Sequence, residues 1–175
     1  QRGDTQRALT IVEWGVGKGA ALIELAGPAV ANAGIRNVRF VGFGDTSFVA
    51  WRETAPGILF ILDTAQHLPD YFEDGEVDLI YSVLGLTHLK EPEERYAHYR
   101  QLAKLLHPEG EILVDNPQLT AAQAWGLGFQ LFERRDGRRR SYRLVHRDAE
   151  GMWPGARGEA IIEEAAALSR LVRPG

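Results

Sequence analysis

The sequence predicts an α/β protein with a mostly parallel sheet and helices on both faces. Three observations favour this class. Apolar runs of strand length alternate with segments of helical pattern, the runs are continuous rather than alternating in polarity, and glycines follow the first run directly. Continuous apolar runs are typical of strands buried on both faces, and helical crossovers are typical of parallel pairing.

The expected elements follow this order along the chain. Strands are expected at residues 9–14, 38–43, 58–63, 77–82 and 110–115. Helical patterns occupy residues 20–32, about 48–53 and 92–106, with a short turn near 68–72 and a short helix at 120–125. The pair Asp136-Gly137 is a hairpin turn signal between two more strands. The result is a mixed seven-stranded sheet with a C-terminal antiparallel hairpin.

Composition and charge exclude several classes of protein. The chain has no cysteine, which excludes disulfides and thiolate metal sites. No apolar run is long enough to span a bilayer and the N-terminus does not resemble a secretory signal, so we expect a soluble, cytoplasmic protein. Residues 1–133 carry 10 basic and 18 acidic side chains, which argues against a broad nucleic-acid footprint. The arginines at 134–147 are interpreted as a solvated hairpin whose arginine stems cover apolar surface, with a site for an anionic substrate or RNA as the alternative.

The stretch VEWGVGKG at residues 12–19 places Gly15, Gly17 and Gly19 at alternate positions after the first strand. A tight turn from strand to helix needs one glycine, so three suggest that a ligand approaches the backbone closely. Ligands of open α/β sheets bind at the carboxyl ends of the strands, where this loop is expected. The spacing excludes a Walker phosphate loop and matches a dinucleotide fingerprint weakly.

Acidic residues end the first three expected strands: Glu13, Asp45 and Asp63. Glu13 would repel a pyrophosphate and attract an ammonium or sulfonium group. Asp45 can accept from both hydroxyls of a ribose, and Asp63 can accept from an adenine amino group. Glu13 and Asp45 could instead cap the helices that follow them. Together the acids predict a pocket for a nucleoside that carries positive charge.

This ordered set of motifs resembles the class I S-adenosylmethionine-dependent methyltransferases of the small-molecule type. VEWGVGKG is similar to the acidic glycine loop of that family, DTS at 45–47 to its motif after the second strand, and LDTAQHLP at 62–69 to its motif after the third. Residues 76–96 and 102–114 resemble its fourth and fifth strands with their flanking segments. The resemblance covers about residues 9–147. It implies a Rossmann-like methyltransferase fold, S-adenosylmethionine as cofactor and methyl transfer to an unidentified small-molecule acceptor.

The resemblance also implies how residues contact the cofactor. Glu13 would lie near the ammonium group, Asp45 with Thr46 at the ribose, and Asp63 with Thr64 at the adenine. The methionine part would lie against Trp14, Gly15, Gly17 and Gly19, and the methyl end would be lined by Ser82, Val83 and Leu84. This sequence departs from the family in Lys18, in the bulk of Trp14 and in Glu109, which replaces the first glycine of a Pro-Gly-Gly turn.

A general base is needed only if the acceptor must lose a proton. His88 is the candidate, with a packing or helix-start role as the alternative. Asp115-Asn116 resembles a pair found in magnesium-dependent catechol-type methyltransferases. Those enzymes need a further acid where this chain has Ser82-Val83, and we therefore expect no metal.

Residues 1–150 are expected to form the S-adenosylmethionine-binding methyltransferase domain, and residues 151–175 a linker and an amphipathic helix that packs on the same domain or on a second copy. The chain begins with Gln1, so we expect a processed start or a piece of a longer chain. We expect a monomer or homodimer with no nucleic-acid or membrane partner. Two other hypotheses stay open: an NAD(P)-dependent reductase, and a non-catalytic relative that binds the cofactor or a partner protein.

Overall fold

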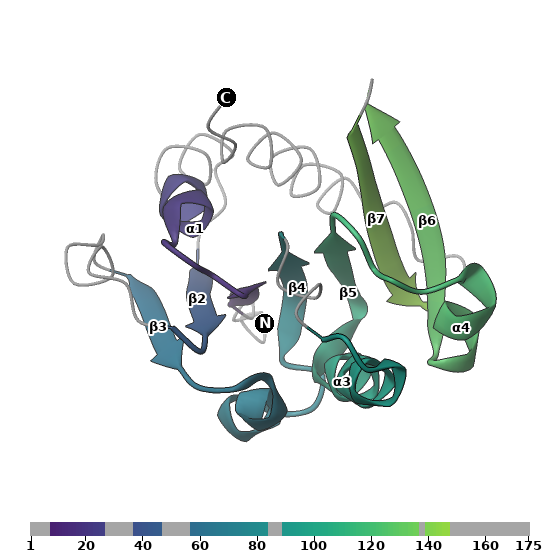
Figure 1. Cartoon of the computed structure of the whole chain (residues 1–175). Coiled ribbons are helices and arrows are strands. Elements are labelled where there is room, and N and C mark those ends of the chain that lie inside the picture. The colour runs from purple at the N-terminus through teal and green to yellow at the C-terminus, as the bar shows by residue number, and fades with distance from the viewer. Residues whose placement is uncertain (1–7, 27–36, 47–56, 84–88, 137–138, 148–175) are drawn as a thin grey trace, which may run out of the picture.

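The seven strands form one mixed sheet, as the sequence predicts. The structure is a computed structural model that describes residues 8–26, 37–46, 57–83, 89–136 and 139–147. The strand order is β3-β2-β1-β4-β5-β7-β6, and the sheet forms a continuous layer (Figure 1). The helix expected near 48–53, the candidate residues Leu84 and His88, and the linker and C-terminal helix lie outside the described residues.

The strand bounds agree closely with the expected ones, except at the fifth strand. The strands are β1 (Leu9–Trp14), β2 (Val38–Gly44), β3 (Ile58–Leu62), β4 (Val77–Ser82), β5 (Leu106–Val114), β6 (Phe129–Asp136) and β7 (Arg139–His146). Strands β1 to β5 pair in parallel, and β7 runs antiparallel to both β5 and β6. The hairpin therefore extends the parallel sheet at its β5 edge.

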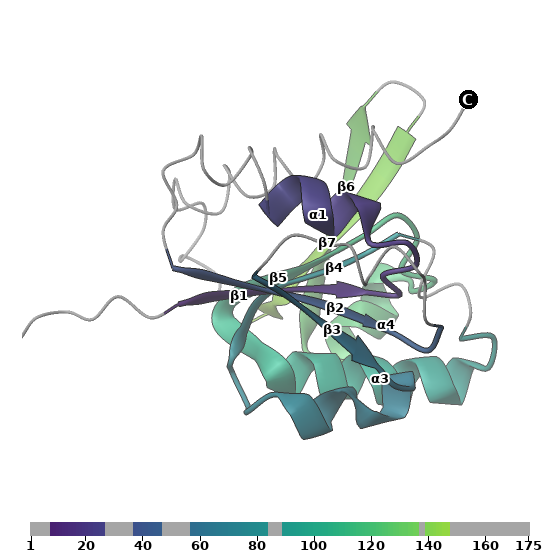
Figure 2. The ribbon, with the colours of Figure 1, turned by 90° about the vertical axis from the view of Figure 1, so that its left-hand side faces the viewer.

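Helices cover the two faces of the sheet unequally in the described part of the chain. Helix α1 (Ala20–Glu24) lies on one face, and α3 (Pro92–Leu105) and the 3-10 helix η3 (Ala65–Tyr71) lie on the other (Figure 2). Proline at the first position and two acids in the first turn favour the start of α3. Helix α4 (Ala121–Gly126) begins with a capping box between Thr120 and Gln123.

Both faces of the sheet are buried, which is why its strands read as continuous apolar runs. On the α3 face, Val12, Val41 and Ile80 pack against α3 and η3 side chains such as Tyr99 and Leu68. On the α1 face, Ile11, Phe40 and Leu79 pack with side chains from the glycine loop and α1, among them Val16 and Leu22.

Strand β5 begins four residues earlier than the sequence pattern indicates. Leu106 pairs with Val77 and Glu111 with Leu79, so residues 107–110 bulge between these pairs. The Pro-Glu-Gly segment expected to form a turn before the strand is this bulge. A Cβ atom at Gly110 would lie 2.9 Å from the carbonyl oxygen of Asp78, which explains the glycine.

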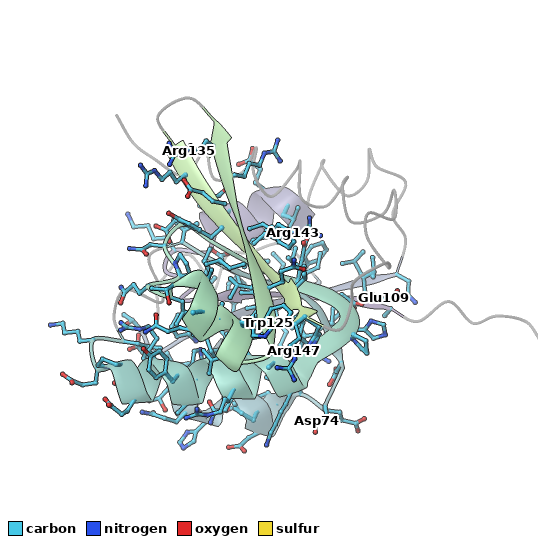
Figure 3. All side chains as sticks on the ribbon, turned by 90° about the vertical axis from the view of Figure 1, so that its right-hand side faces the viewer. Asp74, Glu109, Trp125, Arg135, Arg143 and Arg147 are labelled. Carbon is cyan, nitrogen blue, oxygen red and sulfur yellow. The ribbon has the colours of Figure 1, made fainter. Side chains whose placement is uncertain are left out.

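Four of the described hairpin arginines (Arg134, Arg135, Arg140 and Arg147) are exposed, as expected, and Arg143 is half-buried. The Arg143 Nε atom lies 2.6 Å from Oε2 of buried Glu111, and the guanidinium of Arg143 lies over Phe132. The guanidinium of Arg147 lies over the exposed ring of Trp125, beside it in Figure 3. Near the turn, Arg135 and Arg140 both pair with Glu133. Arg143 and Arg147 therefore cover aromatic surface, as expected, and Arg143 also pairs with a buried acid.

Candidate functional site

The strand order brings the predicted site residues to one edge of the sheet. Strands β3, β2, β1 and β4 are neighbours and parallel, so their carboxyl ends lie side by side. The backbone N–H groups of Gly15 and Val16 donate to the carbonyl of Phe43, and the N–H of Asp63 donates to the carbonyl of Gly44. These bonds tie together the ends of the first three strands, where the three predicted acids lie.

The glycine loop has the backbone that its sequence predicts. Gly15, Gly17 and Gly19 have φ angles of 73°, 52° and 72°, a region that favours glycine. Among the described residues, the nearest atom to a Cβ built at Gly17 is the carbonyl oxygen of Gly15, at 3.9 Å, so they leave the space above this glycine open. The loop can therefore accept a ligand against its backbone.

Glu13 lies on the α1 face of the sheet and is 6% exposed. The N–H of Leu22, in the first turn of α1, donates to its carboxylate. The other oxygen, Oε2, is buried and has no hydrogen-bond partner among the described residues. Burial raises the pKa of Glu13 to about 8, against the opposing effect of the Leu22 bond. Glu13 thus caps the helix with one oxygen, and the other is a buried acceptor that the described residues leave unpaired.

Trp14 points to the opposite face and packs in the α3 core, with its ring centroid 4.6 Å from that of His98. Any contact of Trp14 with a ligand at the sheet edge would therefore come from its backbone. Ser82, at the end of β4, is buried, and its Oγ atom has no hydrogen-bond partner in the described part of the chain. Val83 is half-buried beside the α1-face core.

Asp45 and Thr46 are exposed at the end of β2, and the Thr46 hydroxyl donates to Oδ1 of Asp45 over 3.1 Å. The helix that Asp45 could cap lies outside the described residues. An exposed carboxylate at this place is accessible to the hydroxyls of a ribose.

Asp63 is already engaged by its own chain. Its carboxylate accepts from the N–H of exposed Thr64, contacts Nδ1 of His67 at 2.8 Å, and accepts from the hydroxyl of Tyr71 at 2.6 Å. These bonds, led by Tyr71, lower the pKa of Asp63 to about 2. An adenine amino group would have to share this carboxylate with them, which the sequence did not indicate.

Sequence reasoning did not single out three side chains near the site: His67, Tyr71 and Tyr81. His67 and Tyr71 lie four and eight residues after Asp63, a helical spacing that could have indicated the contacts. Tyr81 lies within the apolar run of β4, where the sequence gives no sign that its hydroxyl differs in role from its apolar neighbours. The described residues include no cluster of side chains that could hold a metal ion, and among them no helix is both long and apolar enough to cross a membrane.

The strand order, the antiparallel seventh strand and the glycine loop after β1 define a Rossmann-like methyltransferase fold. A family model described as a methyltransferase domain matches residues 12–114, more than half of the chain. The chain belongs to this family and is a class I S-adenosylmethionine-dependent methyltransferase. S-adenosylmethionine is its cofactor, and the open loop backbone and the unpartnered Glu13 oxygen fit that group. No curated protein sequence matches the chain.

Solved structures share this fold at low sequence identity. The antibiotic-resistance methyltransferase Kmr is 17% identical, with a TM-score of 0.56 over 81% of this chain and 89% of that one. A TehB-like methyltransferase from Corynebacterium glutamicum is 13% identical, with a TM-score of 0.59 over 81% and 82% of the two chains. LepI in complex with S-adenosylmethionine is 13% identical, with a TM-score of 0.60 over 82% of this chain and 44% of that one.

Proposed function

We propose that this protein transfers the methyl group of S-adenosylmethionine to a small-molecule acceptor, as a cytoplasmic enzyme whose residues 1–150 form the catalytic domain. The observation that best supports binding of the cofactor is the glycine loop, together with the acidic residues at the ends of three neighbouring strands. The hairpin supports a small acceptor, because Arg135, Arg140 and Arg143 pair with acids and Arg147 covers an aromatic ring. A surface for nucleic acid would instead present unpaired basic side chains.

The cofactor supplies an activated methyl group on a sulfonium sulfur, and the protein supplies alignment and a dry site. In this proposal Glu13, Asp45 and the glycine loop bind the two ends of the cofactor and fix the direction of its methyl group. Ser82 and Val83 line the methyl end.

Titration calorimetry with S-adenosylhomocysteine and with NADH tests the cofactor part of this proposal. We expect binding of S-adenosylhomocysteine and none of NADH. Tight NADH binding without binding of S-adenosylhomocysteine would favour the reductase. Methyl transfer from labelled cofactor to a panel of small molecules, set against total RNA, tests the class of acceptor.

Asp45→Ala is expected to weaken binding of S-adenosylhomocysteine about ten- to a hundredfold, because it removes the carboxylate that would accept from the ribose. Stability should change little, since Asp45 is exposed. Asp74→Ala is the matched control, because it removes another exposed acid from the loop before β4. Equal affinity of the Asp45 variant and the wild type would show that the acid serves only the local fold.

Binding of S-adenosylhomocysteine is expected to release a proton from Glu13. Its pKa of about 8 keeps the carboxyl neutral at pH 6.5, and an adjacent ammonium group favours the ionised form. Affinity should therefore rise by up to about tenfold per pH unit between roughly pH 6 and 7.5. Calorimetry in buffers of different ionisation enthalpy measures the protons released. Glu13→Gln should release none, and identical heats for the wild type in all buffers would contradict the prediction.

A further inference from the structure

Three buried polar atoms at the ends of β1 and β4 have no hydrogen-bond partner in the described part of the chain: Oε2 of Glu13, the hydroxyl of Tyr81 and Oγ of Ser82. Glu13 and Tyr81 share one face of the sheet, and Ser82, next to Tyr81 in the strand, points to the other. Glu13 and Tyr81 are almost fully buried, at 6% and 4% exposure. Leaving such a group unpaired costs about 1–3 kcal/mol, so an unpaired pair beside a ligand loop calls for an explanation.

The two side chains are neighbours on the same face of the sheet. Glu13 and Tyr81 are register partners in adjacent parallel strands, which lie about 4.8 Å apart. Tyr81 packs in the α1-face core with Val16 of the glycine loop and Leu22 of α1, the residue whose N–H donates to Glu13. The orphan atoms therefore lie on the side of the sheet from which the glycine loop rises.

The charge states of Glu13 and Tyr81 determine which group could hydrogen-bond to both side chains. Burial raises the pKa of Tyr81, and the nearby Glu13 and Asp115 carboxylates raise it further, so the hydroxyl stays neutral. An ionised Glu13 only accepts hydrogen bonds, and the Tyr81 oxygen can accept one as well. A compact cation with several N–H donors matches this pair, and a primary ammonium group has this chemistry.

We propose that Tyr81 is a cofactor-binding residue whose hydroxyl oxygen accepts a hydrogen bond from the ammonium group of S-adenosylmethionine, next to Glu13. The inference rests on the proposed binding of the methionine end at the glycine loop. It adds a second acceptor, from β4, to a site that the sequence motif placed in β1 alone.

Tyr81→Phe tests the proposal with two ligands. The first is S-adenosylhomocysteine, and the second is its desamino analogue, in which hydrogen replaces the amino group. We expect the variant to bind S-adenosylhomocysteine about tenfold more weakly or worse, and to bind the desamino analogue like the wild type. Unchanged affinity for S-adenosylhomocysteine would overturn the proposal, and so would an equal loss for both ligands.

Tyr99→Phe is the matched control, because Tyr99 is also fully buried and its hydroxyl donates to the carbonyl of Pro117. It should lower the melting temperature and leave the preference between the two ligands unchanged. Tyr81→Phe should keep the melting temperature of the ligand-free protein, since it removes an unpaired hydroxyl.

A crystal structure of the wild type with S-adenosylhomocysteine gives an independent measurement if the variant does not fold. A distance of about 3 Å between the ammonium nitrogen and the Tyr81 oxygen supports the proposal, and a water between them or a separation beyond about 4 Å overturns it. Failure of the wild type to bind S-adenosylhomocysteine at all would instead overturn the proposed function.

Discussion

Gly17→Val is expected to abolish binding of S-adenosylhomocysteine while the protein stays folded. Gly17 has a φ of 52°, and among the described residues only the Gly15 carbonyl, at 3.9 Å, lies within 4 Å of where its Cβ would be. A valine there would occupy the space that we assign to the methionine part of the ligand. Its branched Cβ also disfavours this backbone, so the loop would move away from the conformation that binds. Calorimetric titration measures the loss.

Gly75→Val separates the ligand effect from the backbone effect. Gly75 has a φ of 75°, its Cβ would also meet open space, and it lies in the loop before β4, at the opposite end of that strand from the site. Both variants should lose about 1–3 kcal/mol of folding free energy to backbone strain. Only the Gly17 variant should lose binding. Normal binding by a folded Gly17→Val would show that the loop is merely a turn.

The sequence predicted the sheet well because its strands have a clear sequence pattern. Continuous apolar runs, bounded by glycines and acids, indicated five buried strands, and the Asp136-Gly137 signal indicated the hairpin. The start of β5 was missed because residues 107–110 bulge while pairing resumes at Glu111 with Leu79. A proline and a glycine in sequence indicate a turn, and only the register shows that this turn lies within a strand.

Site residues at the ends of strands were predictable for the same reason, since parallel strands bring their carboxyl ends to one edge. The sequence could not indicate which carboxylates already accept hydrogen bonds from their own chain, or to which face of the sheet each side chain points. Asp63 looked available but is bonded to His67 and Tyr71. Trp14 lies next to the loop in sequence but points into the α3 core. Tyr81 reads as one more apolar strand residue until its register with Glu13 is known.

Unfolding free energy is expected to depend on pH through His98. This side chain is 4% exposed in the α3 core, and its ring lies tilted against that of Trp14. Neither ring nitrogen has a hydrogen-bond partner of normal geometry among the described residues. Burial lowers the pKa of His98 to about 4, with a weaker opposing effect from the nearby Gln101. The unfolded chain, with a histidine pKa of about 6.5, binds a proton that the folded chain excludes. Stability is therefore lost as the pH falls from about 6.5 to 4, by about 3 kcal/mol.

His98→Leu should remove this loss, because leucine fills the same apolar site without a titratable group. Glu13 and Glu111 act in the opposite direction, since burial raises the pKa of both carboxyls and their protonation favours the folded state as the pH falls. The pH dependence of wild-type stability therefore combines opposing contributions, and the difference between the variant and the wild type isolates that of His98.

Urea denaturation at pH 7, 5.5 and 4 measures this difference. Between pH 7 and pH 4 the unfolding free energy of the variant should rise by about 3 kcal/mol relative to that of the wild type. His107→Gln, in the half-exposed bulge of β5, is the control for removal of a histidine outside the core. Parallel curves for wild type and His98→Leu would mean that the folded protein accommodates the imidazolium.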